Sequence, residues 1–200
     1  MAKNKKATGL KKGTYSPVSL DELKRARSST FKPFPPKNAW LEFDFSRFKK
    51  PGEQDIYAAI RQTAEAMLNP PISNVGIKGF YRTAGELEKW QKQFNEKQLR
   101  MVLFNIYIFI EVGGTGGGCF RYMYSRFLKE SFQTIGNHAM KTASDLIFES
   151  GRLFTEIGLL FKDIESSGNL THKIKSAAGK LKQAAIIEEK AYQSLIQNIP

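Results

Sequence analysis

Six residues in the middle of the chain read GGTGGG, and they end directly before its one cysteine, Cys119. A glycine-rich loop that leads into a helix presents free backbone N–H groups, and together with the helix dipole these groups bind phosphate or carboxylate. Arg121 falls in the first turn after the loop and would add cationic donors. The candidate anion-binding residues are therefore Gly113, Gly114, Thr115, Gly116, Gly117, Gly118 and Arg121.

The specific nucleotide-binding versions of such a loop do not match this sequence. Gly113–Gly118 lacks the Lys-Ser/Thr pair of a P-loop, and the dinucleotide fingerprint requires a preceding strand in a βαβ unit that the pattern does not supply. The same glycines also suit a plain turn between helices or a close approach of two backbones. On the sequence alone, both the anion site and the packing role stay open.

Cys119 is the one catalytic candidate. At a helix start the dipole lowers the pKa of a thiol and favours the nucleophilic thiolate, and His138 or His172 would then be the base. The alternative is that this single cysteine fills a small space in the core. No spacing brings either histidine to it, so we expect no catalysis from this chain alone. Two histidines that are not four residues apart predict no metal site, and no cofactor is implied.

The composition fits one globular domain. The chain has 200 residues, 41% of them hydrophobic, which is enough to bury a core. A single cysteine excludes an internal disulfide framework, and the first 13 residues contain no apolar signal-peptide region, so a cytoplasmic location is expected. The longest apolar run, Met101–Ile110, is shorter than the roughly 20 residues of a bilayer-spanning helix. We therefore expect no membrane span.

Positive charge is concentrated at the N-terminal end. Residues 1–50 hold 13 Lys and Arg against 4 Asp and Glu, a net charge of +9, whereas residues 51–200 have a net charge of +3. A basic leading segment attracts polyanions such as nucleic acid, acidic lipid or an acidic protein. The chain has no zinc-finger spacing, basic-zipper pattern or RNP-type aromatic signature, which disfavours nucleic acid. The first lysines also fit a solvated arm.

Three regions follow one another along the chain. Residues 1–18 form the basic arm. Residues 19–54 begin with a capping box, in which Ser19 and Glu22 bond each other's backbone N–H groups, and continue as a strap rich in proline and aromatic residues. We expect the rings of this strap to pack on the helical body. Residues 55–200 form that body.

Apolar residues recur at helical spacing through most of the body. Helices are predicted from Asp55 and from about Tyr81. The run Leu99–Val112 fits both a strand and a helix, and its 14 residues favour a helix. Three amphipathic patterns follow, and the last two pair as an α-hairpin over about residues 137–198. The predicted fold is an all-α bundle of about six helices with an irregular N-terminal segment.

Four motifs keep a characteristic order and spacing between about Ser19 and Ile164: SLDELKRARSS, PFPPKNAWLEFDF, MLNPPISNVGIKGF and IEVGGTGGGCFRYMYSRFLKES. They resemble the C-terminal domain of the butirosin-biosynthesis protein H family, a domain with no assigned function of its own. The most specific part comprises Gly114 to Gly117, Phe120, Arg121, Tyr124, Phe127, Leu128 and Glu130. In that family the preceding domain is similar to cysteine peptidases and thiol acyltransferases, and the founding member moves an aminoacyl group from an acyl carrier protein onto an aminoglycoside.

The resemblance implies an accessory role. The cysteine-peptidase-like N-terminal domain is absent from this sequence, so its activity does not carry over. A helical half of this kind would cover a separate catalytic half, shape an acceptor pocket or dock an acidic acyl carrier protein, and a homo-oligomer is a further expectation. The glycine-rich loop with Arg121 would then hold the phosphate of the carrier's phosphopantetheine. The alternatives are a basic helical module for nucleic acid or another anionic partner and, below it, a stand-alone thiol enzyme using Cys119.

Overall fold

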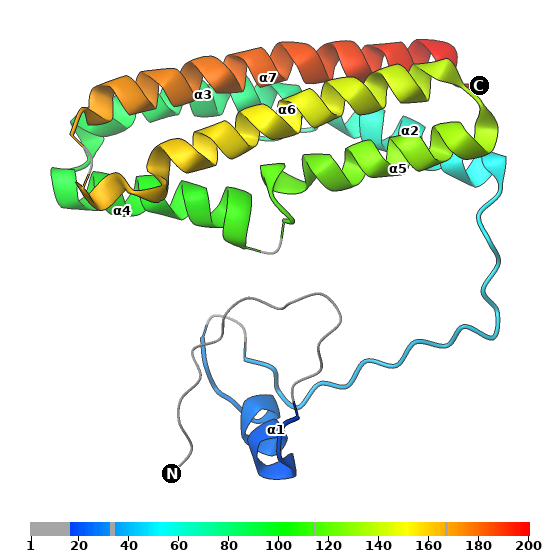
Figure 1. Ribbon diagram of the computed structural model, residues 1–200, viewed down its shortest axis with the longest axis horizontal. Helices are drawn as coiled ribbons and strands as arrows, with labels where there is room; N and C mark the ends of the chain where they lie inside the picture. The colour runs from blue at the N-terminus through cyan, green and yellow to red at the C-terminus, as the bar shows by residue number, and fades with distance from the viewer. Residues whose placement is uncertain (1–16, 33–34, 114, 167) are drawn as a thin grey trace. The chain divides into compact units, whose positions relative to one another are not determined.

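The computed structural model describes residues 17–32, 35–113, 115–166 and 168–200, and over these ranges the chain forms helices and no strand (Figure 1). The predicted all-α bundle is confirmed. The α-helices of the described ranges are α1 (Leu20–Arg27), α2 (Glu53–Leu68), α3 (Gly76–Gln93), α4 (Glu96–Tyr107), α5 (Arg121–Ile135), α6 (His138–Lys162) and α7 (Leu170–Asn198). Shorter helical turns are η1 (Ile108–Val112), η2 (Gly118–Phe120) and η3 (Ile164–Ser166).

The first compact unit, residues 1–49, contains α1. Ser19 caps this helix as predicted, because its Oγ accepts from the Glu22 N–H at 3.2 Å while Glu22 Oε2 accepts from the Ser19 N–H at 2.9 Å. Arg27 and Asn38 tie the helix to the segment behind it. Asn38 N–H donates to the Arg27 carbonyl at 2.8 Å, and the Arg27 guanidinium donates to the Asn38 carbonyl at 2.9 Å.

Two predictions for this unit stay predictions. Most of the basic arm, residues 1–16, lies outside the described residues. The packing of the strap on the bundle is the second of these predictions. Among the described residues of the strap, the large apolar side chains are at least 68% exposed, and these are Phe31, Trp40, Leu41, Phe43, Phe45 and Phe48.

The second compact unit, residues 50–200, is the helical bundle. The two longest helices, α6 and α7, lie along each other, and each of the other α-helices of this unit packs on one of them (Figure 1). α5 packs on α6, α2 and α3 pack on α7, and α4 packs on α6. In the described residues, no helix combines the length and the apolarity that a membrane crossing requires.

Asparagine and aspartate side chains fix where several helices begin. Asn95 Oδ1 accepts from the Gln98 N–H at 3.0 Å at the start of α4, and Asn169 Oδ1 accepts from the His172 N–H at 3.0 Å at the start of α7. Asp55, the predicted first residue of α2, is its third residue instead. Its carboxylate reaches back to the Gly52 N–H at 2.8 Å, which lets the helix start two residues earlier.

The predicted start of α3 at Tyr81 is wrong by five residues, because the helix begins at Gly76. The glycines of the sequence VGIKG suggest a turn. Gly79 instead lies in the first helical turn, where an added Cβ would be 2.6 Å from the Asn74 carbonyl oxygen. This glycine serves a close backbone contact within the helix start.

The core of the bundle consists of two clusters of buried side chains. One joins α3, α4, α6 and the first half of α7 and includes Leu87, Leu103, Ile157, Phe161 and Ile174. The other joins α2, α5, α6 and the second half of α7 and includes Ile60, Leu128, Met140, Ile147 and Leu195. Phe80 packs against both clusters. The glycine-rich loop lies between α4 and α5, where the chain crosses from the first cluster to the second.

Candidate functional site

The segment predicted as the helix Leu99–Val112 ends in a turn of π-helix. This turn places the carboxylate of Glu111 next to the glycine-rich loop. Gly113 N–H donates to the Ile108 carbonyl at 2.7 Å, five residues back, which is the wide hydrogen-bond spacing of a π-turn. Glu111 in this turn accepts from the Gly118 N–H at 3.0 Å and from the Thr155 hydroxyl of α6 at 2.9 Å. The carboxylate therefore links both ends of the loop to α6.

The close backbone approach that the glycines predict is an approach to α6. An added Cβ at Gly118 would be 2.9 Å from the Gly151 carbonyl oxygen and 2.8 Å from the ring of Tyr122. An added Cβ at Gly151 would also meet that ring at 2.8 Å. Tyr122 thus occupies space that two absent side chains leave open, and its hydroxyl lies 3.0 Å from Thr155 Oγ1.

The other loop residues have separate positions. Thr115 is buried, and its hydroxyl donates to the Ile110 carbonyl at 2.5 Å. Gly116 and Gly117 have φ of +71° and +81°, values that suit glycine. Gly114 lies outside the described residues. The Gly118 N–H, one of the donors predicted for an external anion, is bound by the chain's own Glu111.

Arg121, the predicted cationic donor, forms an ion pair with Glu188 of α7. Its guanidinium also donates to the Cys119 carbonyl at 2.8 Å. The same group lies over the ring of Phe154, 3.7 Å from the centroid, and 5.0 Å from the centroid of Phe80. Cation–π contact and a desolvated ion pair together hold this side chain in the bundle interior.

Glu188 is fully buried and accepts from the Ser150 hydroxyl of α6 as well as from Arg121. A buried carboxylate is tolerated when it is paired and hydrogen-bonded, and this one has both kinds of partner. Glu188 was not among the site residues predicted from the sequence. The available signal was its position, because Glu188 continues the spacing of the apolar residues Leu181, Ala184, Ala185, Ala191 and Leu195.

Two tyrosines lie close enough to Glu188 for its charge to affect them. Burial raises the pKa of Tyr124, and the negative charge of Glu188 adds to the effect. Burial likewise raises the pKa of Tyr192, again with a contribution from Glu188. The Tyr124 hydroxyl is buried without a hydrogen-bond partner among the described residues. Both phenols are therefore protonated across the physiological range.

A family model described as "Domain of unknown function (DUF4872)" matches residues 21–195. The chain belongs to this family. No curated protein and no solved structure matches the DUF4872 chain.

Cys119 of this DUF4872 chain is half-buried against the first core cluster and has φ of +50°. Its neighbour Gly118 lies against Gly151, and His138 is 13 residues before Gly151 on α6, about 20 Å away at the helical rise. His172 lies in the first turn of α7, 16 residues and about 24 Å from Glu188. The structure thus brings neither histidine to the thiol.

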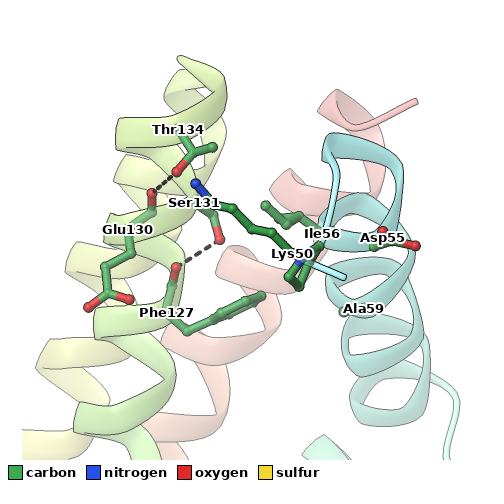
Figure 2. Close-up of a pocket in the computed structure, with 9 residues that line it drawn as sticks. Lys50, Asp55, Ile56, Ala59, Phe127, Glu130, Ser131 and Thr134 are labelled. Atoms are coloured by element: carbon green, nitrogen blue, oxygen red, sulfur yellow. Dashed lines mark hydrogen bonds between the residues drawn. The ribbon is translucent and has the colours of Figure 1, made fainter. Parts of the chain in front are cut away.

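A groove between α2 and α5 is a further candidate site in the DUF4872 chain (Figure 2). Its volume is about 370 Å³, within the range of small-ligand sites. The walls are formed by Lys50, Pro51, Asp55, Ile56, Ala59, Phe127, Glu130, Ser131 and Thr134. A groove depends on the spacing between two helices, which the periodicity of a sequence does not contain.

The hydroxyls of this groove are engaged by their own helix. Ser131 donates to the Phe127 carbonyl at 2.8 Å and Thr134 donates to the Glu130 carbonyl at 3.0 Å (Figure 2). Their carbon atoms therefore contribute to an apolar surface. Lys50 extends across the groove toward Ser131 and Thr134 and supplies a cation at its side (Figure 2). The lining also contains the carboxylates of Asp55 and Glu130, so an apolar group with an attached anion would match it only at the side where Lys50 lies.

Proposed function

We propose that this chain is a non-catalytic helical domain of an acyltransferase-like system and that it binds an acidic acyl carrier protein. The proposal rests on the resemblance to the C-terminal domain of the butirosin-biosynthesis protein H family. The α2/α5 groove is the structural observation that supports this proposal and supplies a binding site for it. An acyl chain would lie on Ile56, Ala59 and Phe127, while Lys50 would pair with the phosphate of the carrier's prosthetic arm.

The charge of the chain supports an acidic partner. The formal net charge is +12, and most of it belongs to residues 1–50. Complementary charge accelerates encounter and selects the partner more than it adds affinity. The exposed aromatic side chains of the strap would supply the apolar contacts that a protein interface needs at its centre. A separate catalytic half is the second partner that this proposal implies.

Binding of acylated and unacylated carrier protein to the full chain, measured by calorimetry at low salt, tests the proposal. We expect Lys50→Glu to weaken binding of both forms about tenfold, since it replaces an attraction by a repulsion. Ala59→Trp fills the groove and should remove only the preference for the acylated form. The matched control is Lys190→Glu, a change at an exposed lysine of α7 outside the groove. Absence of carrier binding to the unaltered chain would overturn the proposal.

The net charge also favours a second candidate, a module that binds nucleic acid or another polyanion. Binding to a DNA duplex should then weaken steeply with salt, because each neutralised phosphate releases a counterion. A flat dependence on salt, or a slope unchanged when the basic residues of 1–50 are neutralised, contradicts this candidate. The thiol-enzyme alternative has a separate test, since Cys119→Ser must abolish any transferase activity that the chain shows.

A further inference from the structure

A second groove lies on the bundle, between α5 and α6, and no function above uses it. Its volume is about 330 Å³ and its walls are Tyr122, Ser125, Arg126, Lys129, Ser144, Asp145 and Phe148. Four of these residues lie on α5 at spacings of three and four, so they form one face of that helix. The others lie on the facing surface of α6.

Reciprocal hydrogen bonds between α5 and α6 form the floor of this groove. The Ser125 hydroxyl donates to the Ser144 carbonyl at 2.8 Å, and the Ser144 hydroxyl donates to the Ser125 carbonyl at 2.7 Å. Both serines are buried. These reciprocal bonds hold α5 against α6 and leave the hydroxyls fully engaged.

One end of the groove is aromatic. The rings of Tyr122 and Phe148 lie 5.2 Å apart between centroids, and Phe148 is 51% exposed. The glycine-rich loop fixes this end, because Gly118 and Gly151 leave the space in which the Tyr122 ring lies. An aromatic ring of a ligand can stack on the exposed face of Phe148.

The other end carries positive charge without an internal counter-ion. Arg126 and Lys129 are exposed, and neither side chain forms an ion pair or hydrogen bond with any residue that the structure describes. The single acidic residue of the lining, Asp145, is engaged by Lys141 at 3.2 Å. Two cations one helical turn apart match the oxygens of a phosphate group.

We infer that the α5/α6 groove binds a phosphorylated small molecule that carries an aromatic ring, with the phosphate on Arg126 and Lys129 and the ring on Phe148. Glu188 already neutralises the charge of Arg121, the anion-binding residue predicted from the sequence. The anion site inferred from the structure instead uses Arg126 and Lys129, the next two cations of the same helix. It does not depend on the proposed carrier protein, which would use the α2/α5 groove.

Phenyl phosphate, inorganic phosphate and phenol are suitable probes, with binding to the full chain followed by calorimetry and by NMR shift mapping. Phenyl phosphate should bind more tightly than either of the other two. Arg126→Gln and Lys129→Gln should each weaken it about tenfold, as expected for loss of one charge-assisted hydrogen bond. Phe148→Ser should remove the advantage over inorganic phosphate and leave phosphate binding unchanged.

The control variant is Lys190→Gln, which neutralises an exposed lysine of α7 and should leave the affinity unchanged. Arg126 and Lys129 are exposed, so unfolding curves of the variants at these two positions should match that of the unaltered chain. The inference is overturned if phenyl phosphate does not bind at millimolar concentration. Equal affinities for the unaltered chain and the Arg126→Gln/Lys129→Gln double variant, or shifts that map elsewhere, would overturn it as well.

Discussion

Arg121 at the start of α5 and Glu188 in the second half of α7 form an ion pair across 67 positions of sequence, inside the bundle. The side chain of Arg121 is 13% exposed and that of Glu188 is 1% exposed. The pair also brings in α6, because Ser150 donates to the same carboxylate. Three helices therefore meet at one buried charge.

Removing one member of this pair should be strongly destabilising. Glu188→Gln leaves the Arg121 guanidinium buried without a counter-charge, and the expected loss in the free energy of unfolding is about 3 to 5 kcal/mol. Urea denaturation measures it. The exposed pair Lys141–Asp145 is the control, since Asp145→Asn should cost less than about 1 kcal/mol.

Removing both members should cost much less than removing one. In Arg121→Met/Glu188→Leu, apolar side chains of similar length replace both charges, and the introduced methionine would keep contact with Phe154. We expect the double variant to recover most of the stability lost in Glu188→Gln. If the double variant is as unstable as Glu188→Gln, the ion pair stabilises the bundle more than two apolar side chains in the same positions do.

Gly151→Ala should destabilise the bundle although alanine is the better helix former. The added methyl would be 2.8 Å from the Tyr122 ring, and overpacking of this kind costs about 1 to 3 kcal/mol. Gly179→Ala is the matched control, because it lies in α7 with open space around it and should stabilise by about 0.5 to 1 kcal/mol. Tyr122→Ala should relieve the penalty at position 151. Thermal unfolding of Gly151→Ala, Gly179→Ala, Tyr122→Ala and the double variant Gly151→Ala/Tyr122→Ala checks this.

Gly118→Ala and Gly116→Ala separate backbone strain from crowding. Both residues have positive φ, +57° and +71°, so alanine at either position costs about 1 kcal/mol or more from the backbone. Only Gly118 is crowded, with Tyr122 and Gly151 within 3 Å of an added Cβ. Gly118→Ala should therefore lower the unfolding midpoint further than Gly116→Ala. Equal midpoints would contradict the close contact with α6.

Tyr124→Phe should change how stability depends on pH. Burial raises the pKa of Tyr124 in the folded state, so the folded chain keeps a proton that the unfolded chain releases above about pH 10. The stability that this group supplies is present below that pH and is lost as pH rises. Phenylalanine at position 124 has no proton to release, so this loss of stability does not occur. The free energy of unfolding, measured by urea denaturation at pH 8 and pH 11, should therefore decline less in the variant than in the unaltered chain.

The same variant should not be less stable at neutral pH. The Tyr124 hydroxyl has no hydrogen-bond partner in the described part of the chain, so removing it deletes a desolvation cost of about 1 kcal/mol. Tyr81→Phe is the control, because Tyr81 is 43% exposed and should show neither effect. A marked destabilisation of Tyr124→Phe at pH 7 would indicate that this hydroxyl is bonded in solution.

The fold could be predicted from local pattern because most of its determinants are local. The Ser19–Glu22 capping box and the helical spacing of apolar residues each act within a few residues of chain, and both are confirmed. The start of α3 was predicted wrongly because a local glycine pattern has two possible causes. At Gly79 a contact with the Asn74 carbonyl, and not a turn, requires glycine, and the two requirements look alike in sequence.

The site was less predictable because its contacts join distant segments. The glycine-rich pattern pointed to Gly118 and Arg121, yet their partners Glu111, Gly151 and Glu188 come from three other elements. A carboxylate on an apolar helix face, as at Glu188, is the one signal that could have been used. Whether the loop also binds an external anion stays a prediction.

The side chains of Ser125 and Ser144 each donate to the other's backbone carbonyl, so two reciprocal hydrogen bonds join α5 to α6. This pair of bonds fixes the rotation of both helices about their axes as well as the distance between them. A larger residue at one position would break both bonds at once, and no change at a third position could restore them. Across the family, these two positions should consequently evolve as a unit, small and hydroxyl-bearing together or replaced together.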